Sequence, residues 1–405
     1  MPTAFRVAMA LCISTLFVGI CANAQSLPRE VATRAEIYPI PSLTLSDQQF
    51  LSGDAAAGKP VTVAGELRVA QGSGKLPVVV LMHGSSGVGT TTEAWVHAFN
   101  AMGISTFVID GFTGRGLTVV GPNQALLGRL NLVIDIYRSL EILAKHPRVD
   151  PDRIVLMGFS RGGQATLYAS LERFHKLWNK SGIQFAAYIP FYPDCSTTYQ
   201  NDTDVAVRPI RIFHGTPDDY NPVKSCKAFV ERLKTAGRDV VLTEYPDSAH
   251  GFDSGLLGVN TVTVSTGAQT VRNCQIREGD GGVLMNADTK APFTYQDACV
   301  ELNPHVGGNP ATAVESRKAV EEFFAGAVQT ELRSNSTLGA GVGATYSVIA
   351  SEAKQSRISP RRQSGLLRRF APRNDGGYGS PGLNGSCLSG GTVSSAIASS
   401  IATIT

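Results

Sequence analysis

Short apolar runs rich in β-branched residues alternate along the chain with longer stretches whose apolar positions recur every three or four residues. The short runs are continuous and end at glycine, proline, histidine or aspartate, which is typical of strands buried on both faces. They occupy residues 78–82, 105–109, 154–157, 186–189, 210–213 and 240–245. The helical stretches occupy residues 93–102, 124–146, 162–173, 223–236 and 312–330. The intervals between the first strands are long enough for crossover helices, so the pattern predicts one α/β domain with a mostly parallel central sheet flanked by helices.

The composition is that of a folded protein. Of the 405 residues, 43% are hydrophobic and 17% are charged, which excludes a disordered chain, a collagen or a disulfide-rich miniprotein. The formal net charge of +3 is made up of +1 in residues 1–24, +5 in residues 334–405 and −3 between them. Because the part expected to fold is mildly acidic, a nucleic-acid partner is not expected.

The first 24 residues have the features of an export signal. Arg6 precedes an apolar run at residues 7–21, and A-N-A at residues 22–24 matches a small-x-small cleavage site. The run is short for a bilayer span, so a membrane anchor is the weaker alternative. We predict a signal peptide at residues 1–24, a mature chain that begins near Gln25 and is not stably inserted in a membrane, and a periplasmic or secreted protein.

Export changes the interpretation of the cysteines, because disulfides form outside the cytoplasm. Cys195, Cys226, Cys274, Cys299 and Cys387 remain after cleavage, and none has the C-x-x-C spacing of a zinc or redox site. Pairing of neighbours gives Cys195–Cys226 and Cys274–Cys299, although four cysteines allow three connectivities. Buried free thiols are the alternative.

Residues 334–405 differ from the rest of the chain because serine and glycine are abundant and the helical period is lost. Few large apolar side chains are present to offset the entropy of ordering, so we predict a disordered basic tail. The stretches 347–357 and 364–376 resemble the translation of a palindromic DNA repeat dispersed between bacterial genes, which implies read-through. A basic arm for anionic surfaces is the alternative, and we assign the tail no function.

The sharpest chemical signal is G-F-S-R-G-G at residues 158–163, between a predicted strand and a predicted helix. G-x-S-x-G in this setting is the nucleophile elbow, in which glycines leave room for a tight turn that raises the serine hydroxyl above the sheet. Ser160 would then lie at a helix N-terminus, where N–H groups stabilise developing negative charge.

A serine nucleophile needs a later acid and a histidine base. His250 follows the last predicted strand and is the better base by chain order. An aspartate would hold its ring in the right tautomer. The competing histidines are His83, His97, His214 and His305.

The motifs H-G-S-S-G at residues 83–87, D-G-F-T-G-R-G at 110–116 and G-F-S-R-G-G at 158–163, followed by residues 214–222 and H-G-F at 250–252, carry a resemblance. Residues from about 40 to 330 resemble the dienelactone hydrolase-like branch of the α/β-hydrolase superfamily. The resemblance implies the α/β-hydrolase fold over a domain at residues 25–333. It also implies Ser160 as nucleophile, Asp218 as acid and His250 as base, with Asp219 and Asp194 as alternatives for the acid.

The same resemblance implies an oxyanion hole made by the N–H of Arg161 and an N–H of Ser85 or Ser86. The Arg161 side chain is expected to make a local contact only. The chain departs from the family's namesakes, which use a cysteine nucleophile and are intracellular and shorter. An insertion at residues 253–300 accounts for part of the extra length.

Together these features predict an exported serine hydrolase that cleaves carboxylic esters or lactones through an acyl-enzyme. The expected partner is a substrate that is either a small molecule or the end of a polymer. No metal or cofactor is expected, because the histidines and acids do not have the spacing of metal ligands. A peptidase or acyltransferase with the same residues and a catalytically silent binding module are the alternatives.

Overall fold

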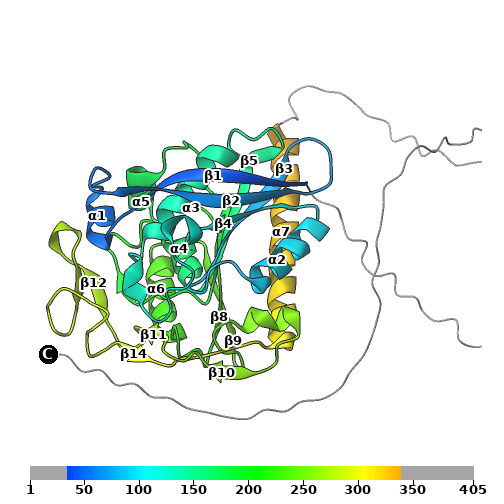
Figure 1. The fold of residues 1–405 in the computed structure, drawn as a ribbon. Coiled ribbons are helices and arrows are strands. Elements are labelled where there is room, and N and C mark those ends of the chain that lie inside the picture. The colour runs from blue at the N-terminus through cyan, green and yellow to red at the C-terminus, as the bar shows by residue number, and fades with distance from the viewer. Residues whose placement is uncertain (1–33, 339–405) are drawn as a thin grey trace, which may run out of the picture. The chain divides into compact units, whose positions relative to one another are not determined.

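A sheet of eight strands runs through the part of the chain that the computed structural model describes, residues 34–338 (Figure 1). Side chains are described as far as residue 326. The predicted signal peptide, the tail beyond residue 338 and Cys387 lie outside the described residues. The long last helix runs to Leu338, five residues beyond the predicted domain boundary at residue 333.

The spatial order of the strands is β1, β2, β4, β3, β5, β6, β8, β9. The pairs β1–β2 and β2–β4 are antiparallel, and all the following pairs are parallel. The strand bounds are β1 Arg34–Thr44, β2 Lys59–Val69, β3 Leu76–Met82, β4 Ser105–Asp110, β5 Val149–Phe159, β6 Ala187–Phe191, β8 Ile210–Gly215 and β9 Val240–Tyr245. Each predicted strand overlaps one of the last six, and the predicted α/β-hydrolase fold with a mostly parallel sheet is confirmed.

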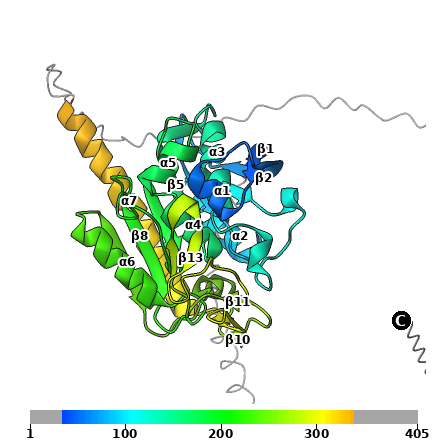
Figure 2. The ribbon, with the colours of Figure 1, turned by 90° about the vertical axis from the view of Figure 1, so that its left-hand side faces the viewer.

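The helices cover both faces of this sheet. They are α1 Asp47–Ser52, α2 Thr90–Ala101, α3 Asn131–Leu143, α4 Arg161–Tyr168, α5 Glu172–Trp178, α6 Val223–Thr235 and α7 Pro310–Leu338, with 3₁₀ turns η1 Thr113–Arg115, η2 Gln124–Leu126, η3 Phe252–Leu257 and η4 Asp280–Gly282. One buried cluster joins one face of the sheet to α1, α3, α4, α5 and α6, and a second joins the other face to α2 and α7. Figure 2 shows β1 and β2 at one end of the sheet and β8 with α6 and α7 at the other.

Two predicted helices are shorter than expected. The helix predicted at residues 124–146 begins only at Asn131, because the Asn131 amide donates to the carbonyl of Leu45 and the N–H of Leu130 donates to Asp47. The helix predicted at residues 162–173 is divided into α4 and α5. At the break, residues 170–172 form hydrogen bonds with residues 204–206 in place of helical ones.

Between His250 and α7 the chain forms short ribbons instead of extending the sheet. The insertion predicted at residues 253–300 extends to the start of α7, and from here on we use the name insertion for residues 253–309. Its strands are β10 Val262–Val264, β11 Gln269–Thr270, β12 Ile276–Glu278, β13 Leu284–Asn286, β14 Glu301–Leu302 and β15 His305–Gly307. They pair as β10–β15, β11–β14 and β12–β13, and β12 also pairs with β7 (Thr197–Thr198).

The structure forms the two preferred disulfides. Cys195–Cys226 ties the segment after β6 to α6, and Cys274–Cys299 closes a loop within the insertion. No helix among residues 34–338 combines the length and apolar content that a membrane span requires.

Candidate active site

Ser160 occupies a strained turn between β5 and α4. Its backbone lies at φ 54° and ψ −115°, outside the regions that most non-glycine residues adopt. A Cβ at Gly158 would lie 2.3 Å from the carbonyl oxygen of Gly162, and one at Gly162 would lie 2.2 Å from that of Met82. The glycines on both sides of Ser160 are therefore required by close backbone packing, as the elbow motif predicts.

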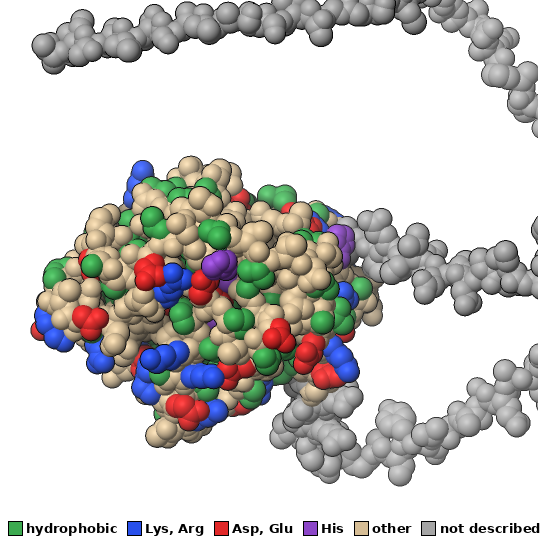
Figure 3. All heavy atoms as spheres, turned by 90° about the horizontal axis from the view of Figure 1, so that it is seen from below, with side chains coloured by type: hydrophobic (Ala, Val, Ile, Leu, Met, Phe, Trp, Pro, Cys, Tyr) green, Lys and Arg blue, Asp and Glu red, His purple; other side chains and the backbone are tan. Residues whose placement is uncertain are grey.

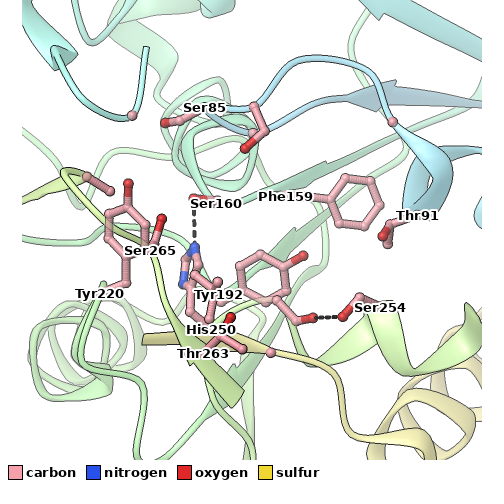
Figure 4. Close-up of a pocket in the computed structure, with 18 of the residues that line it drawn as sticks. Ser85, Thr91, Phe159, Ser160, Tyr192, Tyr220, His250, Ser254, Thr263 and Ser265 are labelled. Carbon is pink, nitrogen blue, oxygen red and sulfur yellow. Dashed lines mark hydrogen bonds between the residues drawn. The ribbon is translucent and has the colours of Figure 1, made fainter. Parts of the chain in front are cut away.

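A chain of two hydrogen bonds links Ser160 to a buried carboxylate. His250 Nε2 lies 2.8 Å from Ser160 Oγ (Figure 4). His250 Nδ1 lies 2.8 Å from Asp218 Oδ2. The other carboxylate oxygen, Oδ1, accepts the N–H groups of Tyr220 and Asn221 at 2.9 and 2.8 Å. The structure thus brings together the serine, histidine and aspartate that the sequence singled out.

Aromatic rings fix the orientation of the imidazole. The rings of Tyr192 and Tyr220 each lie with their centroids 4.7 Å from that of His250. Tyr192 is itself anchored, because its hydroxyl donates to Asp253 at 2.7 Å. Trp95 Nε1 donates to the same carboxyl group at 2.9 Å, and burial raises the pKa of Asp253 against the effect of these two hydrogen bonds.

None of the four competing histidines is hydrogen bonded to Ser160, although His214 Nδ1 lies 3.9 Å from Asp218 Oδ2. His83 and His214 are buried, each with Nδ1 hydrogen bonded to the carbonyl of the following glycine, and burial lowers the pKa of both. His97 is exposed on α2. His305 is half exposed, and its Nδ1 lies 2.8 Å from Asp219 Oδ2.

The two alternative acids also have other partners. Asp219 forms an ion pair with Arg272 in addition to its contact with His305. Burial acts to raise the pKa of Asp219, but the hydrogen bonds from His305 outweigh it and the pKa is lowered. Asp194 is paired with Arg129. Neither of these aspartates is bonded to His250.

The predicted oxyanion-hole residues surround Ser160. The loop after β3 approaches closely, since a Cβ at Gly84 would lie 3.2 Å from Ser160 Cβ, and Figure 4 shows Ser85 beside Ser160. Ser86 lines the same cavity. Arg161 is the first residue of α4, so its N–H is among those that a helix leaves without an internal partner.

The Arg161 side chain was expected to make a local contact, but it binds a segment that is distant in the sequence. Its guanidinium is buried and donates to Gln124 and to the carbonyls of Leu127 and Gly128. Burial lowers its pKa.

Sequence reasoning missed the part that the insertion plays in the site. Strand β15 contacts the loop that carries His250 and the loop that carries Asp219. Val306 forms a β-bridge with His250, and the N–H of Gly307 donates to the His250 carbonyl at 2.9 Å. The N–H of His305 donates to Asp219 at 2.8 Å. These are mostly backbone contacts between distant segments, and no sequence pattern marks them.

A cavity of about 640 Å³ opens beside Ser160 and His250, between the loop after β3 and the insertion. Figure 3 shows the molecule from the side on which β10, β11 and β14 lie in Figure 1. On this face charged side chains gather mainly over one half, and the other half is largely uncharged.

Within residues 34–326 no group of three or more histidine, cysteine, aspartate or glutamate side chains is arranged to hold a metal ion.

Two proteins named for esterase activities resemble parts of the chain. Acyl-protein thioesterase 1 of Gibberella zeae is 32% identical over 100 residues, which are 25% of this chain and 42% of the thioesterase. The chain therefore spans less than half the length of this relative. A thermophilic esterase from Thermogutta terrifontis has a TM-score of 0.37 at 20% identity, covering 47% of this chain and 80% of the esterase.

Further similarities are to dienelactone hydrolases. The crystal structure of a putative dienelactone hydrolase from Klebsiella pneumoniae has a TM-score of 0.43 at 17% identity, covering 55% of this chain and 89% of that one. The model of the dienelactone hydrolase family matches residues 64–255, a range that includes Ser160, Asp218 and His250. Over these residues, the predicted resemblance to the dienelactone hydrolase family is therefore confirmed.

Proposed function

We propose that this protein is a serine hydrolase that cleaves carboxylic esters, with Ser160 as nucleophile, His250 as base and Asp218 as acid. The observation that carries the proposal is the unbroken chain of hydrogen bonds from Ser160 Oγ through the imidazole to Asp218, at 2.8 Å and 2.8 Å. A serine, a base and an orienting carboxylate within hydrogen-bonding reach are the geometric requirements of this chemistry.

The geometry accounts for each step. His250 Nε2 takes the proton from Ser160 Oγ as the oxygen attacks the ester carbonyl, and the negative charge that develops is stabilised by N–H groups of Arg161 and the loop after β3. His250 then gives the proton to the departing alcohol, which leaves an acyl group on Ser160. Water, deprotonated by the same imidazole, attacks the acyl-enzyme and releases the acid.

Asp218 is held in the position that this cycle needs. Its Oδ1 accepts two backbone N–H groups, while Oδ2 faces His250 Nδ1. In this position Asp218 orients the imidazole, with Nδ1 toward the carboxyl group and Nε2 toward Ser160. The rings of Tyr192 and Tyr220 restrict rotation of the imidazole.

Labelling with a fluorophosphonate probe tests this assignment. We expect mass spectrometry to find the label on the peptide that contains Ser160, together with turnover of p-nitrophenyl acetate. Ser160→Ala should lose both. Folded protein that neither takes up the label nor hydrolyses the ester would support a silent binding module. Labelling at Ser160 with cleavage of peptides but not of esters would support a peptidase, and labelling with acyl transfer but no hydrolysis would support an acyltransferase.

We also propose that the protein is exported to the periplasm or secreted. This is supported by the two disulfides, which are typical of oxidising compartments. Expression of the full chain in a bacterium followed by fractionation and N-terminal sequencing tests it. A mature protein that begins near Gln25 in the periplasm or medium is expected, and an uncleaved cytoplasmic chain would contradict export.

A further inference from the structure

The cavity beside Ser160 is rich in hydroxyl side chains. Its volume of about 640 Å³ is that of a site for a small organic ligand. Hydroxyls reach it from the start of α2 and from the insertion around β10, and they include Thr90, Thr91, Thr261, Thr263, Ser265 and Thr266. Each such group can both donate and accept a hydrogen bond, which is the chemistry that recognises another hydroxyl.

Three of the hydroxyls that the insertion contributes to the cavity are free to bind. Thr261, Thr263 and Thr266 are exposed, and their side chains have no hydrogen-bond partner among the described residues. Thr263 pairs across the β10–β15 ribbon with Val306, which bridges to His250, so one row of residues connects the imidazole to this threonine. Figure 4 accordingly shows Thr263 close to His250.

The cavity offers no cation to a negatively charged ligand. No lysine or arginine lines it within the described residues, and its one carboxyl side chain, Asp253, is buried and engaged by Trp95 and Tyr192. A carboxylate moved from water into this site would lose hydration without gaining an ion pair. The lining therefore suits an uncharged ligand.

Two arginines share a cavity with Ser160, but it is a different one. Arg129 and Arg161 line a separate cavity of about 30 Å³ that touches Ser160 but not His250. The guanidinium of Arg129 is bound to Asp194 and Tyr295, and that of Arg161 is bound to Gln124 and two backbone carbonyls. This small cavity has room for only a few atoms.

The position of His250 decides which part of an ester occupies the large cavity. His250 must deliver a proton to the departing alcohol, so the alcohol lies on the side of Ser160 where His250 is exposed to ligand. His250 lines the large cavity and not the small one. The hydroxyl-rich lining therefore faces the alcohol portion of the substrate.

We propose that the substrates are uncharged esters of polyols, in which a short acyl group is carried by an alcohol with further free hydroxyls, as in an ester of glycerol or of a sugar. This inference rests on the proposed function. The rings of Phe159, Tyr192 and Tyr220, which also line the cavity, provide flat apolar surfaces for the C–H faces of such an alcohol.

Three acetate esters with alcohol portions of equal size test the proposal on the full chain. Glycerol 1-acetate carries free hydroxyls, pentyl acetate is apolar, and 3-acetoxypropanoate is anionic. We expect kcat/KM for glycerol 1-acetate to exceed that for pentyl acetate at least about tenfold, the effect of one or two hydrogen bonds. The anionic ester should be the poorest of the three.

Variants at Thr263 locate the effect. Thr263→Val keeps the shape and removes the hydroxyl, so it should reduce the preference for glycerol 1-acetate over pentyl acetate by a few fold. Thr235→Val, on the exposed side of α6 and away from the cavity, should leave that preference unchanged. Thr263→Lys should raise the ratio of anionic to neutral turnover about tenfold over the uncharged control Thr263→Gln.

Equal or faster turnover of pentyl acetate, or of 3-acetoxypropanoate, by the unaltered protein would overturn the polyol proposal and leave the serine hydrolase in place. A preference that Thr263→Val does not change would overturn the role given to this side of the cavity. Absence of turnover with p-nitrophenyl acetate as well would instead overturn the proposed function, and the polyol proposal with it.

Discussion

The candidate site is assembled from two regions built in different ways. Ser160 and Asp218 follow buried parallel strands, β5 and β8, and their backbone is enclosed so tightly that Gly158 and Gly162 have no room for a Cβ. The insertion instead consists of ribbons of two or three residues, and its strand β10 is exposed along its whole length. Through β15, the insertion nevertheless contacts the loops that carry His250 and Asp219.

This difference separates reaction chemistry from recognition. The sheet holds the nucleophile and the acid at fixed positions, because moving either would disturb close-packed strands. The insertion supports His250 and Asp219 from outside and supplies many of the hydroxyls that line the cavity. Changes in the insertion should therefore alter which ester is cleaved more than whether one is cleaved, whereas changes at the sheet edge should affect all substrates alike.

The largest expected effect is on the sheet side. Asp218→Asn should lower kcat for p-nitrophenyl acetate by about 10³–10⁴-fold, because an amide does not hold the imidazole in the required tautomer. The cavity and KM should change little. Steady-state kinetics on protein shown by circular dichroism to be folded checks this. Retention of more than a tenth of the turnover would remove Asp218 from the proposed mechanism.

Substitutions in the sheet and its helices should affect stability more than substitutions in β10 of the insertion. Phe324 of α7 is 6% exposed and packs on Phe99 of α2, so Phe324→Ala should lower the free energy of unfolding by about 3–5 kcal/mol. Val262 of β10 is 55% exposed, and Val262→Ala should change it by no more than about 0.5 kcal/mol. Urea unfolding of both variants is the measurement. Similar losses would show that β10 contributes to the core, as Val271, Ile276 and Leu284 elsewhere in the insertion do.

The two disulfides allow a comparison at nearly equal loop length. Their cysteines are 31 and 25 residues apart, so chain entropy gives each about 3–4 kcal/mol. Replacing Cys195 and Cys226 by serine should lower the global unfolding midpoint. Replacing Cys274 and Cys299 should mainly loosen the insertion, with faster amide exchange there and a raised KM. A larger fall in the global midpoint for the second pair would show that the insertion, whose Cys274 packs in the main buried cluster, unfolds together with the rest of the domain.

The regular part of the fold could be predicted because burial on both faces produces continuous apolar runs, and each of the six predicted strands exists. β1 and β2 gave no such run. In β1, exposed positions alternate with partly buried ones, so no continuous apolar run forms. Pro39 and Pro41 also argue against a central strand. The structure places β1 at the edge of the sheet, where proline is tolerated. The break between α4 and α5 could not be predicted for another reason. It depends on hydrogen bonds to residues 204–206, which are distant in the sequence.

The candidate site was predictable to the extent that it is local in sequence. Ser160 is marked by flanking glycines, and His250 by its place after a strand. The choice of Asp218 over its neighbour came from the family resemblance, because two adjacent aspartates look alike in the sequence. Tyr192, Asp253 and Val306 could not be assigned, since their roles depend on contacts between segments that only the folded chain brings together.

The smallest expected effect concerns the contact of Asp219 with the insertion. Asp219→Asn should lower kcat/KM less than about tenfold, because Asp218 still orients His250.

The lowered pKa of Asp219 means that its contact stabilises the fold above the ordinary aspartate pKa of about 3.9, and that this contribution is lost as pH falls through the lower folded value. Asp219 and His305 are 34% and 52% exposed, so the difference from Asp219→Asn should be at most about 1 kcal/mol at pH 6 and smaller at pH 3. Urea unfolding at both pH values measures it, with Asp239→Asn, on the far edge of the sheet, as a control that should leave kcat/KM unchanged. If Asp219→Asn is instead the variant that loses 10³-fold or more of the activity, the acid has been assigned one residue too early.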